Sequence, residues 1–151
     1  MSAIIKHSNP NFAKQIYERF GKMGKKEVAV GFPAGKAQAY PDGTEVAFVA
    51  ACHVYGLGVP RRDFMGLALD GIREKAMPIM HKVVQAKTEN EAKALLNAAG
   101  LVAQKEIQKA IVDLEDPPLA PETIERKGSD NPLIDTGHML QSVTYIVRDK
   151  K

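Results

Sequence analysis

The N-terminal part of the chain shows helical periodicity before any other pattern. Phe12, Ile16 and Phe20 repeat every four residues and would form one buried stripe. The pair Asn9-Pro10 precedes them, and Asn is a good helix cap while Pro is tolerated at the first helical position. The pattern predicts a helix that ends at Gly21 or Gly24.

Two segments alternate or are β-branched instead. Lys26 to Phe32 places Val28 and Val30 on the same side as Phe32, which is typical of a strand. The run Val143 to Val147 is β-branched and aromatic, which also favours a strand. We expect both strands, near 26–32 and 143–148, in one small antiparallel sheet.

Residues 33–43 are predicted to be a long loop, because Pro41-Asp42-Gly43 is a typical turn sequence. Thr44 is a candidate cap for a helix with Val46, Val49, Ala50 and His53 or Val54 on one face. Gly56 and Gly58 would end that helix.

The central third of the chain predicts further helices. Asp63 is a plausible cap for a helix running to about Val83, which Pro78 should kink or split. The capping-box sequence that begins at Thr88 predicts a long amphipathic helix to about Leu114, and this helix would be the spine of the fold.

An extended arm, residues 116–136, is expected to follow. Four of the nine prolines lie between Pro117 and Pro132, and Pro121 to Lys127 is long enough for one or two helical turns. Such an arm is poor at folding on itself and suited to lying on a neighbour. Together the elements predict a single α+β domain over residues 1–151, with helices covering one face of the sheet.

Composition narrows the class of protein. Residues 1–37 hold seven Lys or Arg against two Glu, a net charge of +5, so the remainder carries −2 of the total +3. This asymmetry would suit a head-to-tail match between copies, or it is a solvated basic face. The single cysteine, Cys52, excludes an internal disulfide and is expected to be a buried, inert thiol in a protein made in a reducing cytoplasm. No apolar run approaches the roughly 20 residues that span a bilayer.

The histidines, the cysteine and the glycines do not occur at the sequence spacings typical of catalytic or metal sites. No histidine lies at metal-site spacing from another histidine or from Cys52, and no phosphate-binding glycine loop or nucleophile elbow occurs. His53 is expected to be structural. Arg61-Arg62-Asp63 would contact phosphate or an acidic neighbour, or form an exposed turn with a cap. We therefore expect no enzyme, no cofactor and no metal.

Four segments in order resemble one known family. They are the strand and loop Val28 to Pro33 with Tyr40 to Thr44, the helix Val46 to Gly56, the link Val59 to Met65, and the closing segment Ala120 to Gly128 with Pro132 to Tyr145. These resemble the tail-completion, or neck, proteins that join head to tail in long-tailed phages, including putative tail components of lambda-like siphophages and prophages. Val54 and Asp63 depart from the family pattern, where an acidic residue and a proline are usual.

The resemblance implies a non-enzymatic virion protein at the neck of the tail, assembled in the bacterial host cytoplasm as a ring of six copies. Its partners would be other copies of itself, a tail-terminator or tail-tube protein and a head connector or portal-associated protein, with DNA at most passing through the lumen. Candidate interface residues are Tyr40, Asp42, Arg61, Arg62, Pro118, Arg126 and Lys127. One alternative is a nucleic-acid-binding phage accessory protein that uses the basic N-terminal third, and a small enzyme is another.

Overall fold

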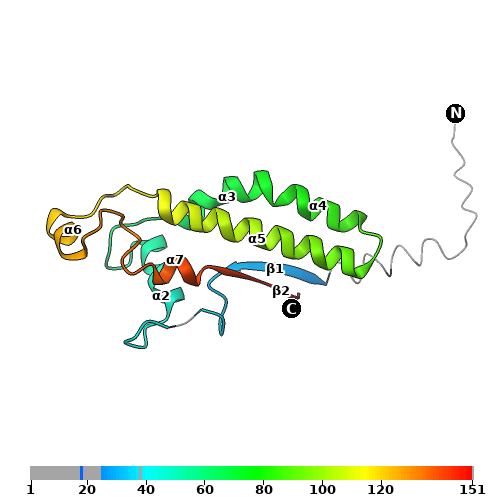
Figure 1. Ribbon diagram of the computed structural model, residues 1–151, viewed down its shortest axis with the longest axis horizontal. Coiled ribbons are helices and arrows are strands. Elements are labelled where there is room, and N and C mark those ends of the chain that lie inside the picture. The colour runs from blue at the N-terminus through cyan, green and yellow to red at the C-terminus, as the bar shows by residue number, and fades with distance from the viewer. Residues whose placement is uncertain (1–17, 19–24, 38, 151) are drawn as a thin grey trace, which may run out of the picture.

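The computed structural model describes residue 18, residues 25–37 and residues 39–150. Within that part the elements follow the order β1, α2, α3, α4, α5, α6, α7, β2 (Figure 1). The fold is α+β, with a two-stranded antiparallel sheet packed against helices, as the sequence predicts. The predicted helix after Asn9-Pro10 lies outside the described residues, except for Glu18, which is helical.

The sheet pairs the first and the last of these elements. Strand β1 (Lys26–Gly31) is antiparallel to β2 (Thr144–Asp149). Val28 lies opposite Val147 and packs with it against buried residues of α4 and α5. Strand β2 starts one residue later than predicted, because Val143 ends the preceding helix and is buried in the core.

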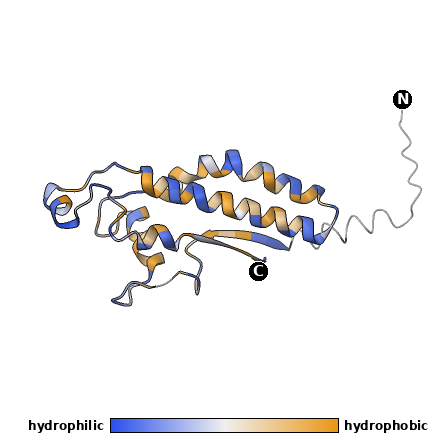
Figure 2. Ribbon diagram, viewed as in Figure 1, coloured by the Kyte–Doolittle hydropathy of each residue, from blue (hydrophilic) through white to orange (hydrophobic). Residues whose placement is uncertain are grey.

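Three helices cover one face of this sheet. Helices α3 (Phe64–Lys75) and α4 (Met77–Gln85) lie beside the long helix α5 (Glu89–Asp113), and α5 contacts both strands (Figure 1). Hydrophobic and hydrophilic residues alternate along the α5 ribbon, as expected of an amphipathic helix (Figure 2). The largest fully buried side chains are Phe64, Ile107, Ile111, Val46 and Val143.

The break between α3 and α4 falls where the sequence predicts a split. Pro78 occupies the first turn of α4, where its missing N–H costs no intrahelical hydrogen bond. Ala76 connects the two helices and is buried, so the break lies on the core side of the pair. Proline therefore divides what would otherwise be one continuous helix.

Three of the predicted caps fall among the described residues, and two of these are present. The Asp63 carboxylate accepts a hydrogen bond from the Gly66 N–H at 2.8 Å at the start of α3. Thr88 Oγ1 accepts from the Glu91 N–H at 3.1 Å at the start of α5. The Glu91 carboxylate accepts from the backbone N–H of Lys87 at 2.7 Å, one residue earlier than in a standard capping box.

The third predicted cap, Thr44, is wrong. Helix α2 (Val46–Tyr55) has Glu45 at the cap position, with no side-chain cap hydrogen bond. The N–H of Thr44 instead donates to Asp42 Oδ1 at 2.9 Å, and its carbonyl accepts from the Tyr40 N–H at 2.8 Å. The helix starts later because the backbone of Thr44 closes the preceding turn.

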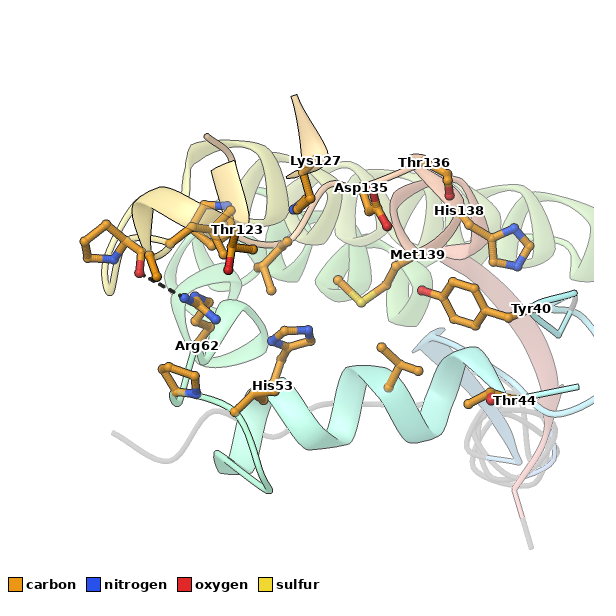
Figure 3. Close-up of a pocket in the computed structure, with 18 of the residues that line it drawn as sticks. Tyr40, Thr44, His53, Arg62, Thr123, Lys127, Asp135, Thr136, His138 and Met139 are labelled. Carbon is orange, nitrogen blue, oxygen red and sulfur yellow. Dashed lines mark hydrogen bonds between the residues drawn. The ribbon is translucent and has the colours of Figure 1, made fainter. Parts of the chain in front are cut away.

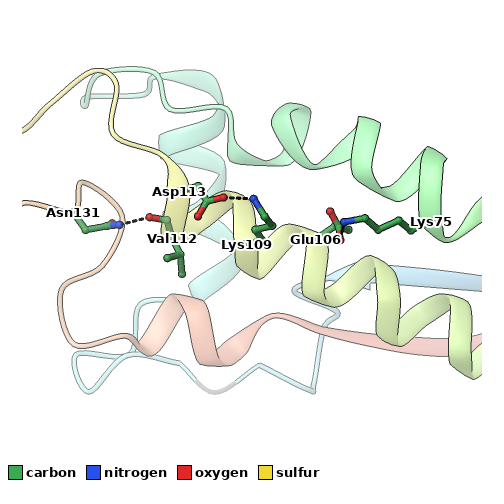
Figure 4. A network of polar contacts seen from close by, with 6 residues as sticks. All are labelled: Lys75, Glu106, Lys109, Val112, Asp113 and Asn131. Atoms are coloured by element: carbon green, nitrogen blue, oxygen red, sulfur yellow. Dashed lines mark hydrogen bonds and ion pairs between the residues drawn. The ribbon is translucent and has the colours of Figure 1, made fainter.

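The arm packs against its own chain, so the expectation that it would be poor at folding on itself is wrong. Asn131 Nδ2 donates to the carbonyl of Val112 on α5 at 2.8 Å (Figure 4). Asn131 Oδ1 accepts from the N–H groups of Leu133 and Ile134, and the Leu133 side chain is buried. The arm also contains helix α6 (Pro121–Lys127), within the range that the sequence predicted.

Ion pairs on the helices add to this framework. Lys75 Nζ lies 2.7 Å from Glu106 Oε1 and joins α3 to α5, while Lys109 pairs with Asp113 along α5 (Figure 4). Glu106 is the more buried of the two α3–α5 partners, with 13% of its side chain exposed. The pair therefore fixes α3 against α5 beside the apolar contacts.

Candidate functional site

A groove of about 550 Å³ lies between α2, the arm and the segment that leads into helix α7 (His138–Ser142) (Figure 3). It brings together five of the seven residues that the sequence suggested as an interface: Tyr40, Asp42, Arg62, Pro118 and Lys127. The other two, Arg61 and Arg126, are exposed and do not line it. Five residues that the sequence predicted as an interface, although far apart in the chain, thus line one groove.

The neighbouring arginines Arg61 and Arg62 point to different environments. Arg61 is exposed; its Nε donates to the carbonyl of Val54 at 3.1 Å, and its Nη2 pairs with Asp63 at 2.8 Å. Arg62 is only 4% exposed, and its backbone N–H donates to the carbonyl of His53 at 2.7 Å. Both residues thus satisfy carbonyls at the C-terminal end of α2, where positive charge is favourable.

Arg62 is the buried charged residue of the described part of the chain. Its Nε donates to the carbonyl of Pro117 at 2.9 Å and its Nη2 to that of Pro118 at 3.3 Å, so it holds the arm against the link after α2. No ion pair joins it to a described carboxylate. Burial lowers the pKa of Arg62, yet guanidinium stays protonated in proteins, so a cation faces this end of the groove.

His53 lies beside Arg62 and was expected to be structural, but the structure places it in the wall of the groove (Figure 3). Its Nδ1 is buried and has no hydrogen-bond partner among the described residues. Burial lowers the pKa of His53, and the charges of Arg62 and Lys127 lower it further. The imidazole is therefore neutral near pH 7, with one ring nitrogen unsatisfied.

The wall of the groove near Tyr40 carries acidic side chains. The rings of Tyr40 and His138 lie 4.6 Å apart between centroids, and Asp42 and Asp135 both line the wall. Burial raises the pKa of Tyr40, and the two carboxylates raise it further. Asp135 and His138 were not predicted as site residues from the sequence, although both lie in the closing segment that resembles the tail-completion family.

The outer face of α2 is a second candidate site, and none of the interface residues predicted from the sequence lies on it. The segment from Val46 to Pro60 contains no charged residue. Phe48 is 63% exposed, Tyr55 72% and Leu57 57%, while the opposite side of α2 is buried in the core. A helix that is hydrophobic on all sides but lies at the surface indicates a contact with another molecule. The absence of charge was the signal available in the sequence.

Cys52 lies on this same helix and is half-buried, so the expectation of a buried thiol is only partly met. Its position between Phe48 and Tyr55 at helical spacing makes it part of the same face. The described part of the chain contains no group of three or more His, Cys, Asp or Glu side chains that could hold a metal ion. Among the described helices, none is long and apolar enough to cross a membrane.

The basic N-terminal third is described only from Lys25 onwards, apart from Glu18. Within it, Lys26 forms an ion pair with Asp149 of β2 at 2.8 Å. That pair turns one of the basic charges toward the neighbouring strand.

Comparison of the chain with protein family models, with curated proteins and with solved structures finds no match. A proposal of function therefore depends on the groove, on the outer face of α2 and on the segments that resemble tail-completion proteins.

Proposed function

We propose that this protein is a structural component of the virion of a tailed bacteriophage or prophage. It would join head and tail, or complete the tail, as a ring of six copies at the neck end of the tail. The exposed, uncharged face of α2 and its following turn, from Phe48 to Val59, carries this proposal. A monomer gains nothing from keeping such a surface in water, whereas a subunit of an assembly buries it.

A ring requires two different surfaces on each copy, because its interfaces are head-to-tail. The outer face of α2 would be one surface. Exposed hydrophobic side chains on other elements offer the second: Leu67 and Leu69 on α3, Met77 and Val84 on α4, and Leu101 and Val112 on α5. The uneven charge along the sequence would add an electrostatic attraction between neighbouring copies.

The resemblance to tail-completion proteins supplies the place of assembly. It covers the strand and loop before α2, α2 itself, the link that holds Arg61 and Arg62, and the closing segment with α7 and β2. In the fold these segments surround the groove and the apolar face. The groove and the apolar face of α2 thus lie within the regions that resemble the family.

The test is the molar mass of the purified protein by light scattering over a concentration series, with particles imaged by negative stain. We expect rings of about six chains of 16.5 kDa each. Tyr55→Glu, which places a charge on the apolar face, should give monomers with unchanged circular dichroism. Asn90→Glu, an exposed change in the first turn of α5, is the matched control and should leave the rings intact.

A wild-type chain that stays monomeric at every concentration would contradict self-assembly. Salt-dependent binding to duplex DNA by that monomer, with affinity falling steeply as salt rises, would favour the nucleic-acid alternative instead.

A further inference from the structure

Three nitrogen-bearing side chains line the same groove, and the charges of two of them act on the third by lowering its pKa. They are His53 from α2, Arg62 from the link after α2, and Lys127 from the end of α6 (Figure 3). The three segments are brought together by the hydrogen bonds from Arg62 to the carbonyls of Pro117 and Pro118. The contacts that hold the arm in place therefore also bring these basic side chains to the groove.

The hydrogen-bonding capacity of these groups is only partly used. A guanidinium has five N–H donors, and two hydrogen bonds from Arg62 to described residues are present. An ammonium has three donors, and Lys127 Nζ gives one to the carbonyl of Asn131 at 3.0 Å. His53 Nδ1 has no partner in the described part of the chain. The described hydrogen-bond partners of the Arg62 and Lys127 side chains are carbonyl oxygens. A positive charge without a carboxylate partner, in a site partly shielded from water, favours binding of an anion.

The rest of the lining selects among anions. Asp42 and Asp135 also line the groove, where their charges act on Tyr40 and would repel a phosphate backbone that continued along it. Val49, Leu133 and Met139 contribute apolar positions to the wall. This combination of basic, apolar and acidic side chains suits a short peptide that offers both a carboxylate and backbone N–H groups.

We propose that the groove binds an acidic peptide segment of a partner protein, with a Glu or Asp side chain held among Arg62, His53 and Lys127. The apolar part of the segment lies on Met139 and Leu133, and its N–H groups face Asp42 and Asp135. This site is separate from the outer face of α2 and does not depend on the ring. A monomeric chain would bind such a peptide equally well.

The probe is the peptide acetyl-Leu-Glu-Leu-amide, with acetyl-Leu-Gln-Leu-amide as its uncharged counterpart. Both are titrated into the full-length protein while the imidazole signals of His53 and the Nε–H signal of Arg62 are followed by NMR. We expect saturable shifts with the Glu peptide at about millimolar concentration and binding about tenfold weaker with the Gln peptide. Equal binding of the two peptides, or no shift with either, would overturn the proposal.

The adjacent residues Lys127 and Arg126 provide a matched pair of variants, because Lys127 lines the groove and Arg126 is exposed outside it. Lys127→Met should weaken binding of the Glu peptide about fivefold, and Arg126→Met should not change it. Equal effects of the two variants would show that general surface charge, and not the groove, attracts the peptide, and this result would refute the site. Shifts at His53 and Arg62 with inorganic phosphate or duplex DNA, but not with the Glu peptide, would also refute it.

Discussion

The ring of Tyr145 on β2 lies directly against Gly100 on α5, at a point where a Cβ atom would overlap the ring. The hydroxyl of Tyr145 donates to Asn97 Oδ1 one turn earlier at 3.3 Å. The sheet can approach the long helix this closely only because residue 100 has no side chain.

Gly100→Ala should therefore destabilise the protein, although alanine is the better helix former by about 1 kcal/mol. Overlap with the ring must push the strand or the ring away, at a cost of about 1–3 kcal/mol in the free energy of unfolding. Urea unfolding followed by circular dichroism measures this difference. Gly71→Ala is the comparison, because a Cβ there meets the carboxylate end of Glu106, which can turn away with the loss of its ion pair to Lys75, a smaller cost than displacing a ring. Equal stability of the two variants would disprove the close approach.

Arg62→Met should release the arm from the link after α2. The carbonyls of Pro117 and Pro118 lose a charged donor, a change that typically costs about 1.5–3 kcal/mol. Hydrogen exchange measured by mass spectrometry should become faster in residues 119–128. Arg61→Met is the comparison, since its ion pair with Asp63 is largely in solvent and should contribute less than about 1 kcal/mol. Unchanged exchange in the arm of Arg62→Met would argue against this anchoring role.

The two threonines that the sequence suggested as caps should respond differently to the same substitution. Thr88→Ala removes the cap of α5 and should lower the free energy of unfolding by about 1 kcal/mol. Thr44→Ala should have a smaller effect, because Thr44 caps no helix and its side chain bonds only to the exposed Asp42 carboxylate in its own turn. Chemical denaturation of both variants measures the two changes in the free energy of unfolding. A larger loss in Thr44→Ala than in Thr88→Ala would contradict the start of α2 at Val46.

Stability should fall at mildly acidic pH because of His53. Burial and the neighbouring charges of Arg62 and Lys127 lower the pKa of His53 in the folded protein below its value of about 6.5 in the unfolded chain. The unfolded chain therefore binds the proton more readily, so this contribution to stability is fully present above about pH 6.5 and is lost as the pH falls toward the lower folded pKa.

Denaturation curves at several pH values between neutral and mildly acidic measure this dependence. His53→Gln should flatten it, whereas His81→Gln, at an exposed position on α4, should preserve the wild-type slope. A slope unaffected by His53→Gln would show that other groups cause the acid sensitivity.

The fold was largely predictable where local signals agree with tertiary packing. The helix that begins at Thr88 has a cap, a regular apolar face and no proline, so its bounds could be predicted to within about a residue. Pro78 was likewise a reliable signal, because proline is tolerated in the first turn of a helix and kinks or breaks the helix elsewhere. Thr44 misled the prediction because a turn beside it competes for the same backbone groups, and sequence spacing does not show which contact forms.

The groove was predictable only in part. Tyr40, Asp42, Arg62, Pro118 and Lys127 were suggested as interface residues from their segments, but their meeting at one cavity depends on contacts between residues about 55 positions apart. His53 gave no such signal, because a lone histidine in an apolar helix is usually structural. Its missing hydrogen-bond partner is visible only once Arg62 and the arm are in place.

The sheet also determines how the molecule responds to force. The carbonyl of Lys25 accepts a hydrogen bond from the N–H of Lys150, so both outer ends of the antiparallel pair lie at the same end of the sheet. Tension applied between residues 25 and 150 would load the backbone hydrogen bonds of β1 and β2 one after another, starting at Lys26 and Asp149. The strands would open like a zipper and leave α5 without its cover, so this protein should be mechanically weak along that direction.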